Sequence, residues 1–251
     1  MDPAVLREDM VDSLEHETKA ALSTENVALA MRDVPREPFV ENERAAYADR
    51  ATDADGTTVL APSTAARLLD SLDASDGHSI LIVGVGVGYT AAVLAEISGQ
   101  EYVHGIDIDR NMVYTARQNL AHAGYSGVLV DRRDGSQGFA EYAPFDRILV
   151  EAAAVRPPRA LIEQLTEEGR LAMPMGAGEQ TLCALDSTGE IRDRICPVAF
   201  RPLLIEGQQP GRLERNRTER EDREFAERNA QRRHGWEQEW IDWERGGSRY
   251  R

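Results

Sequence analysis

The feature that most constrains the fold is an apolar run at residues 79–83 that leads directly into three glycines at alternate positions, Gly84, Gly86 and Gly88. A helical pattern begins at the next residue, Tyr89. A glycine turn between a buried strand and a helix allows a ligand to lie directly on the backbone at the carboxyl end of the strand. The segment therefore predicts the first strand, turn and helix of a ligand-binding α/β fold.

Strands and helices alternate after this unit. Further short apolar runs, typical of strands buried on both faces of a sheet, lie at 102–106, 127–130 and 146–150. The helical patterns that separate the strands lie at about 89–98, 110–123 and 158–165. Three more short strands, including an antiparallel edge, are predicted at 169–174, 180–185 and 192–199. The pattern predicts an α/β fold with a Rossmann-like, doubly wound, mostly parallel sheet of seven strands.

The residues before the first strand predict a helical lead-in. Charged and apolar positions alternate at helical spacing across 4–31, and Pro35 and Pro38 end this segment. Residues 62–72 form a further helical pattern with its apolar positions on one side. Residues 50–58 are mostly polar, and we expect them to form a loop.

The composition changes again near the end of the chain. Residues 206–251 are rich in arginine and acidic residues and hold all the tryptophans, at positions 236, 240 and 243. This spacing puts Trp236, Trp240 and Trp243 on one face of a predicted helical tail. The face fits packing on the core or on a second subunit, in a homo-oligomer, and a partner-recognition helix is the alternative. The predicted divisions are 1–75, 76–205 and 206–251.

The charge balance excludes some classes of function. The chain has 44 acidic residues against 29 basic ones, a net charge of −15, and its single lysine is Lys19. A negative field opposes general binding to a nucleic-acid backbone, which needs a basic face. It also indicates a protein that stays soluble in concentrated salt, with a coding bias towards arginine as the alternative.

The cysteines and the apolar runs predict where the protein acts. Cys183 and Cys196 form no CxxC pair, and the charged first residues do not resemble a secretory signal. No apolar run is long enough to cross a bilayer. We therefore expect a cytoplasmic protein with no membrane partner.

The spacing of the glycines and of an acid in the second strand narrows the ligand. A dinucleotide fingerprint, GxGxxG, needs a small residue where Tyr89 stands, whereas GxGxG suits S-adenosylmethionine, which has no pyrophosphate. Asp107 ends the second strand, 19 residues after Gly88, where a carboxylate can accept both ribose hydroxyls. Asp134 and Gly135 follow the third strand, where a side chain can reach the adenine edge. An ordinary Asp-Gly turn is the alternative there.

Together with their neighbours, these residues resemble the protein-L-isoaspartate O-methyltransferase family over about residues 32–176. The segments that carry the resemblance are VPREPFV at 34–40, AYAD at 46–49, TVLAP at 58–62, GVGVGY at 84–89, GID at 105–107, DGSQG at 134–138, APFD at 143–146, AAA at 152–154, QLTEEGRL at 164–171 and PMG at 174–176. The glycine loop is common to many methyltransferases, but the other segments in this order are specific.

The resemblance implies S-adenosyl-L-methionine as cofactor and methyl transfer to the free carboxylate of L-isoaspartyl residues in damaged proteins. It implies no metal. The residues that it places at the cofactor are Gly84, Gly86, Gly88, Asp107, Asp134 and Gly135. It places Thr57, Thr58 and Leu60 on the substrate side, as candidate catalytic positions, within the lead-in region. The charge composition would make the chain a divergent, haloarchaeal member.

Three departures from the family's pattern leave alternatives open. Leu60 stands at the position of a family serine, and Ile82 at that of an acid before the first glycine. Glu151 replaces a small or hydroxyl residue before the three alanines at 152–154. One alternative is a paralogue that methylates a different acceptor. The other is a non-catalytic module that binds the cofactor or a partner protein.

We expect salt to stabilise this protein. Salt at about 1 M screens charges beyond roughly 3 Å, and so it should relieve the mutual repulsion of an excess of acids. The melting temperature should therefore rise when potassium chloride is increased from about 0.1 M to about 2 M. A flat or falling melting temperature over this range would contradict a salt adaptation.

Overall fold

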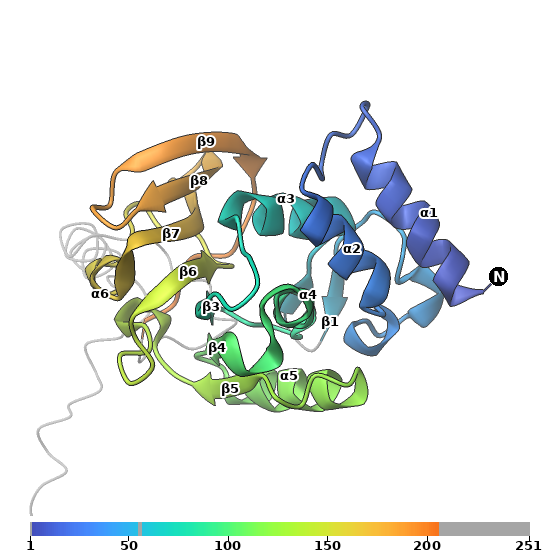
Figure 1. Ribbon diagram of the computed structural model, residues 1–251, viewed down its shortest axis with the longest axis horizontal. Helices are drawn as coiled ribbons and strands as arrows, with labels where there is room; N and C mark the ends of the chain where they lie inside the picture. The colour runs from blue at the N-terminus through green and yellow to red at the C-terminus, as the bar shows by residue number, and fades with distance from the viewer. Residues whose placement is uncertain (1, 55–56, 206–251) are drawn as a thin grey trace, which may run out of the picture. The chain divides into compact units, whose positions relative to one another are not determined.

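The structure, a computed structural model, describes residues 2–54 and 57–205. Its centre is a seven-stranded sheet in the order β5-β4-β3-β6-β7-β8-β9 (Figure 1). The strands from β5 to β7 in this order are parallel, and β8 and β9 join as antiparallel neighbours at the edge. The strands are β3 (Ile80–Val83), β4 (Val103–Asp107), β5 (Leu129–Arg132), β6 (Phe145–Val150), β7 (Leu165–Met175), β8 (Gln180–Asp186) and β9 (Ile191–Val198). The predicted mostly parallel, Rossmann-like sheet is confirmed.

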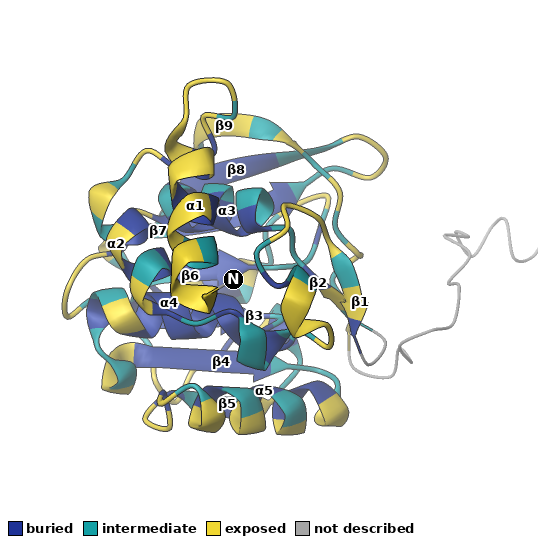
Figure 2. Cartoon of the chain, turned by 90° about the vertical axis from the view of Figure 1, so that its right-hand side faces the viewer, coloured by how far each residue is buried: buried dark blue, intermediate teal, exposed yellow. Residues whose placement is uncertain are grey.

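Helices cover the two faces of this sheet unequally. The helices are α1 (Pro3–Glu15), α2 (Glu25–Asp33), α3 (Pro62–Leu72), α4 (Tyr89–Ser98), α5 (Arg110–His122) and α6 (Arg159–Glu163). Figure 1 shows α3, α4 and α5 on one side of the sheet, with α1 and α2 outside them, and the short α6 on the opposite side. Figure 2, which looks onto α1 and α2, shows the buried strands behind this helical layer.

The predicted burial of the strands on both faces is confirmed by β3. Ile80 and Ile82 belong to an apolar cluster shared with α1–α5, whereas Leu81 and Val83 belong to a second cluster on the opposite face. Side chains of a strand alternate between its two faces, so a strand that is apolar at every position must be covered on both. The carboxyl end of β3, where the glycines begin, therefore lies at the middle of the sheet.

The helix at 62–72 agrees with its prediction to the residue. Pro62 occupies the first turn, where its missing N–H costs nothing, and the helix ends at Asp73, which adopts a left-handed φ of 55°. The lead-in at 4–31 contains two helices, α1 and α2, separated at a turn in which Ala20 has φ 41°. Ser23 and Thr24, which offer an N-cap in the sequence, directly precede the start of α2 at Glu25.

The expected loop at 50–58 is wrong. This segment contains a two-stranded antiparallel hairpin, β1 (Thr52–Ala54) and β2 (Thr57–Val59). Each strand buries one apolar side chain, Ala54 or Val59, in the cluster beneath α1–α5. The other described residues of the two strands are polar and half-buried or exposed, so composition alone could not distinguish the segment from a loop.

The structure does not test the predictions for the tail and for the divisions of the chain. The tail at 206–251, with its three tryptophans, lies outside the described residues, and the divisions 1–75 and 76–205 stay a prediction. Within the described residues, no helix is both long enough and apolar enough to cross a membrane.

Gln164 joins α6 to the loop that covers the second apolar cluster. Its Oε1 atom accepts a hydrogen bond from the Phe139 N–H at 2.8 Å, and its Nε2 donates to the Gln137 carbonyl at 2.9 Å. Replacement by leucine would leave two backbone groups without partners, each costing about 1–3 kcal/mol. We expect Gln164→Leu to lower the free energy of unfolding by about 2–4 kcal/mol in a urea titration.

Gln118→Leu is the matched control for this prediction. Gln118 is exposed on α5, and its side chain bonds only to Tyr114 one turn away. Surface changes of this kind usually alter stability by less than about 0.5 kcal/mol. Equal effects of the two substitutions would show that Gln164 does not fix the loop.

Candidate active site

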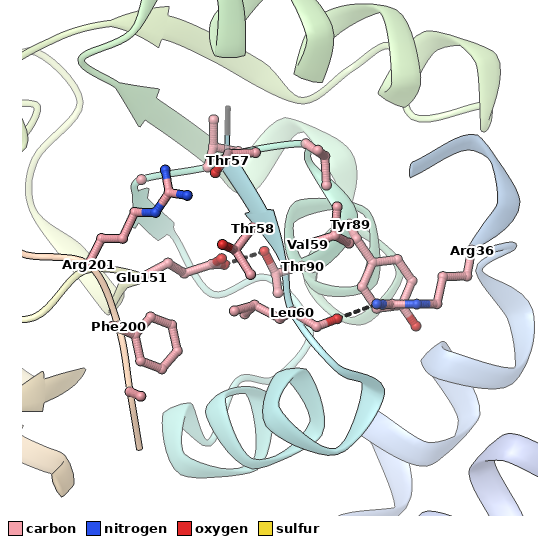
Figure 3. A pocket seen from close by; sticks show the side chains of 15 residues that line it. Arg36, Thr57, Thr58, Val59, Leu60, Tyr89, Thr90, Glu151, Phe200 and Arg201 are labelled. Carbon is pink, nitrogen blue, oxygen red and sulfur yellow. Dashed lines mark hydrogen bonds between the residues drawn. The ribbon is translucent and has the colours of Figure 1, made fainter. Parts of the chain in front are cut away.

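A cavity of about 290 Å³ lies beside the carboxyl ends of β3 and β6. Its size is close to the lower end of small-molecule sites, which hold roughly 300–1,000 Å³. Figure 3 shows side chains from separate parts of the chain meeting around it. The segments and residues that line it are Arg36, 57–60, 84–87, Tyr89, Thr90, Glu151 and 199–201.

The glycine loop forms one wall of this cavity. Gly84, Gly86 and Gly88 have φ values of 83°, 52° and 96°, which L-residues with side chains rarely adopt. The N–H groups of Gly84 and Val85 both donate to the carbonyl of Ile106, at 2.8 and 3.1 Å. These bonds tie the loop to β4 and leave its backbone facing the cavity.

Asp107 ends β4 next to this loop. Its Oδ2 accepts a hydrogen bond from the Gly86 N–H at 3.1 Å, and its Oδ1 accepts one from the Asp109 N–H at 3.0 Å. Burial raises the pKa of this carboxyl, and the two N–H donors oppose that shift. The predicted proximity of Asp107 to the glycine loop is thus found in the structure. A carboxylate fixed in this way has lone pairs left for ligand hydroxyls.

Asp134 and Gly135 lie at a turn after β5 and do not line the cavity. The Oδ1 atom of Asp134 accepts hydrogen bonds from the N–H and the hydroxyl of Ser136, at 2.9 and 2.7 Å. A Cβ atom on Gly135 would collide with Val83 of β3, which explains the glycine. The local geometry is that of an Asx turn, and the adenine contact of Asp134 stays a prediction.

Thr57, Thr58 and Leu60 line the same cavity as Gly84 and Gly86. Gly88 and Asp107, like Asp134 and Gly135, are not among the residues that line it. The Thr58 hydroxyl donates to Oδ1 of Asp53, across the hairpin, at 3.5 Å. The Leu60 side chain packs against the apolar cluster, and its carbonyl accepts a hydrogen bond from Nη2 of Arg36. Thr57 and Thr58, two of the residues predicted for the substrate side, belong to β2 of the unpredicted hairpin, and Leu60 follows it directly.

Arg36 and Tyr89 close one end of the cavity. Arg36 is only 2% exposed, and its guanidinium carbon lies 4.5 Å from the centroid of the Tyr89 ring. Burial lowers the pKa of Arg36 and raises that of Tyr89. Neither was predicted as a site residue. The available signal for Arg36 was a charged pair, Arg36 and Glu37, within the otherwise apolar segment at 34–40.

Glu151 lies at the other end of the cavity, directly after β6. Its Oε1 accepts a hydrogen bond from the Thr90 hydroxyl, drawn as a dashed line in Figure 3. Burial raises the pKa of this carboxyl to about 8, against the effect of the Thr90 bond, and the charge of Asp107 adds to the shift. Sequence reasoning noted Glu151 only as a departure. Its position after the strand beside β3 was the signal that could have placed it here.

Phe200 and Arg201 complete the cavity from a segment that follows β9. The carbonyl of Arg201 accepts a hydrogen bond from the Ala153 N–H at 2.8 Å, and the Ala153 carbonyl accepts one from the Leu203 N–H at 2.8 Å. This short parallel bridge holds the segment against the residues after β6. No sequence pattern pointed to these two residues, because only the return of the chain from the sheet edge brings them here.

The comparisons with known proteins agree with this geometry. The chain matches the protein-L-isoaspartate(D-aspartate) O-methyltransferase family over residues 6–205. It is 37% identical over 206 residues to the protein-L-isoaspartate O-methyltransferase of Methanosarcina mazei, covering 79% of this chain and 83% of that protein. The enzyme of the same name from Methanothrix thermoacetophila is 40% identical over 186 residues, or 72% of this chain and 89% of that one.

Two solved structures share the fold. A protein-L-isoaspartate O-methyltransferase has a TM-score of 0.68 at 24% identity, over 78% of this chain and 65%, just under two thirds, of that one. A structure of this type from Plasmodium falciparum, in complex with S-adenosyl-L-homocysteine, has a TM-score of 0.68 at 22% identity, over 79% and 98%. Given the match over most of its length, the chain belongs to the protein-L-isoaspartate(D-aspartate) O-methyltransferase family.

Proposed function

We propose that this chain transfers the methyl group of S-adenosyl-L-methionine to the free carboxylate of L-isoaspartyl residues in damaged proteins. The observation that supports this most is that the glycine loop and the residues Thr57, Thr58 and Leu60 line the same cavity. Membership of the family agrees with it. We place the reaction in the cytoplasm, in agreement with the free cysteines Cys183 and Cys196, and we expect no nucleic-acid substrate.

The residues present fit the cofactor. The backbone of the loop at 84–88 is open to a ligand because three glycines with positive φ carry no side chains over it. Asp107 would hold the ribose hydroxyls, and Asp134 and Gly135 would border the adenine. When bound, S-adenosylmethionine supplies an electrophilic methyl group on a sulfonium. The protein's own task is to orient the acceptor and to keep water away.

The acceptor itself needs little activation. A carboxylate with an ordinary pKa near ~4 is already ionised at neutral pH, so the protein need not provide a general base. Alignment of the reacting groups can be worth up to roughly 7–11 kcal/mol. Thr57 and Thr58 offer hydroxyls for orientation, Leu60 and Phe200 offer apolar surface that excludes water, and Arg201 adds a positive charge at the rim.

The structure also supports a second candidate, a paralogue that methylates a different acceptor. Leu60 lines the cavity and cannot donate or accept a side-chain hydrogen bond. Glu151 adds an acid to the same cavity, and an ionised acid there would repel a carboxylate acceptor. The non-catalytic binding module is the third candidate, and the two experiments below distinguish all three.

Asp107→Ala should weaken cofactor binding. Loss of charge-assisted hydrogen bonds to the ribose predicts a loss of about 1.5–3 kcal/mol in the binding free energy, measured by calorimetry. Asp131→Ala is the matched control, because Asp131 is an acid on the neighbouring β5 that pairs with Arg133 instead. An unchanged affinity for Asp107→Ala would show that the cofactor lies elsewhere.

The substitution Leu60→Ser should raise the rate of methyl transfer to an isoaspartyl peptide. One positioned donor is typically worth roughly 10²–10³ in rate, so the wild type should be slow and Leu60→Ser faster by up to that factor. Thr58→Val should lose most of the slow wild-type activity. With leucine at position 60, Thr57 and Thr58 are the residues of the segment at 57–60 that offer a hydroxyl to the acceptor. Labelled methyl transfer in molar salt measures these rates.

Thr52→Val is the control for the hairpin substitutions. Thr52 pairs with Val59 in the same hairpin but does not line the cavity, so this variant should keep the wild-type rate. Cofactor binding without transfer in both wild type and Leu60→Ser would refute the isoaspartyl reaction. Transfer to another acceptor would then favour the paralogue, and its absence the binding module.

A further inference from the structure

Glu151 stands where the glycine loop meets the cavity. Its backbone N–H donates to the Val83 carbonyl at 2.8 Å, which fixes it beside the end of β3. A Cβ atom placed on Gly84 would lie 3.8 Å from the Cβ of Glu151, so the two residues are in van der Waals range. In Figure 3 its carboxyl group points into the space between Thr90 and Thr58. The acid therefore belongs to both the loop and the cavity.

Glu151 has no cationic partner in the part of the chain that the structure describes. Among the described residues, Glu151 forms no ion pair, and the hydroxyl of Thr90 is its side-chain hydrogen-bond partner. Arg201 and Arg36 are the other charged residues that line this cavity, and the charge of Asp107 on β4 raises the pKa of Glu151 further. Glu151 is half-buried. Removing a carboxylate from water without a cation is costly, and this desolvation raises its pKa to about 8. A ligand that brings a positive charge would remove this cost.

We propose that Glu151 binds the positive charge in the methionine half of the cofactor, the sulfonium or the α-ammonium group. This inference rests on the proposed function, because it requires S-adenosylmethionine in the cavity. Charge complementarity supports this assignment. The carboxyl group of Glu151 has an uncharged hydroxyl as its hydrogen-bond partner, and it borders the loop on which a cationic ligand would lie. Glu151 is then a cofactor-binding residue.

Cofactor binding and proton release are then coupled. With a pKa of about 8 in the free protein, Glu151 is mostly protonated at neutral pH, and pairing with a cation favours its ionised form. Binding should therefore release a proton at pH 7, and the affinity should increase as the pH rises towards 8. The α-amino group of the ligand titrates near ~8 as well, in the opposite sense, so a variant without the acid must serve as reference.

Calorimetry on the full-length protein tests this, with S-adenosylmethionine and S-adenosylhomocysteine as probes. The variants are Glu151→Gln, which keeps the shape and the Thr90 bond, and Glu168→Gln, an exposed acid on β7. We expect Glu151→Gln to weaken S-adenosylmethionine binding by about 10- to 100-fold and to abolish proton release, measured in buffers of different ionisation enthalpy. Glu168→Gln should match the wild type.

The two probes locate the charge. If Glu151 faces the sulfonium, Glu151→Gln should weaken S-adenosylmethionine binding more than binding of the uncharged thioether product. If it faces the α-ammonium, both should weaken equally. A thermal melt confirms that Glu151→Gln is folded, since loss of a half-buried acid without a cationic partner should leave the melting temperature equal or higher.

Two results would overturn the assignment. Wild-type affinity and wild-type proton release in Glu151→Gln would show that Glu151 does not meet the cofactor's charge, and the isoaspartyl reaction would be unaffected by that result. Absence of binding of either probe to the wild-type protein would overturn both the assignment and the proposed function.

Discussion

The hydrogen bonds between the glycine loop and the end of β4 are the interaction on which the site depends. The Ile106 carbonyl takes two loop N–H groups, and the next residue, Asp107, takes a third from Gly86. Three glycines with positive φ make this path possible, and the parallel pairing of β3 with β4 brings the partners into reach. The loop and the acid are thereby fixed before any ligand arrives, which lowers the entropic cost of binding.

The opposite wall depends on a second constraint, the buried Arg36. Its guanidinium stacks on Tyr89, the first residue of α4, and donates to the carbonyl of Leu60. It thus connects the lead-in, the substrate-side hairpin and the helix after the glycine loop. A buried cation is expensive without such partners, and these contacts therefore set how far apart the two walls lie. Segments far apart in the sequence share one cavity for this reason.

Charge distinguishes this cavity from a purely apolar one. Burial raises the pKa values of the Glu151 and Asp107 carboxyl groups. The hydrogen-bond partners of these two groups differ. Asp107 is held by two backbone N–H groups, whereas Glu151 has one neutral hydroxyl. This difference in partners is the reason why we propose Asp107 for the hydroxyls of a neutral sugar and Glu151 for a cation. Two of the departures noted in the sequence, Glu151 and Leu60, line this cavity.

The sequence by itself determined the sheet, the helix at 62–72, the glycine loop and the place of Asp107, because these follow from local apolar periodicity and from backbone angles that only glycine adopts easily. Tertiary structure decided the hairpin at 52–59, whose burial depends on two side chains. It also decided that Glu151 and Phe200 line one cavity. Strand order places Glu151 beside β3, and its position after a strand was a local signal. Phe200 reaches the cavity only through the return of the chain after β9, and long-range packing of this kind leaves no local pattern.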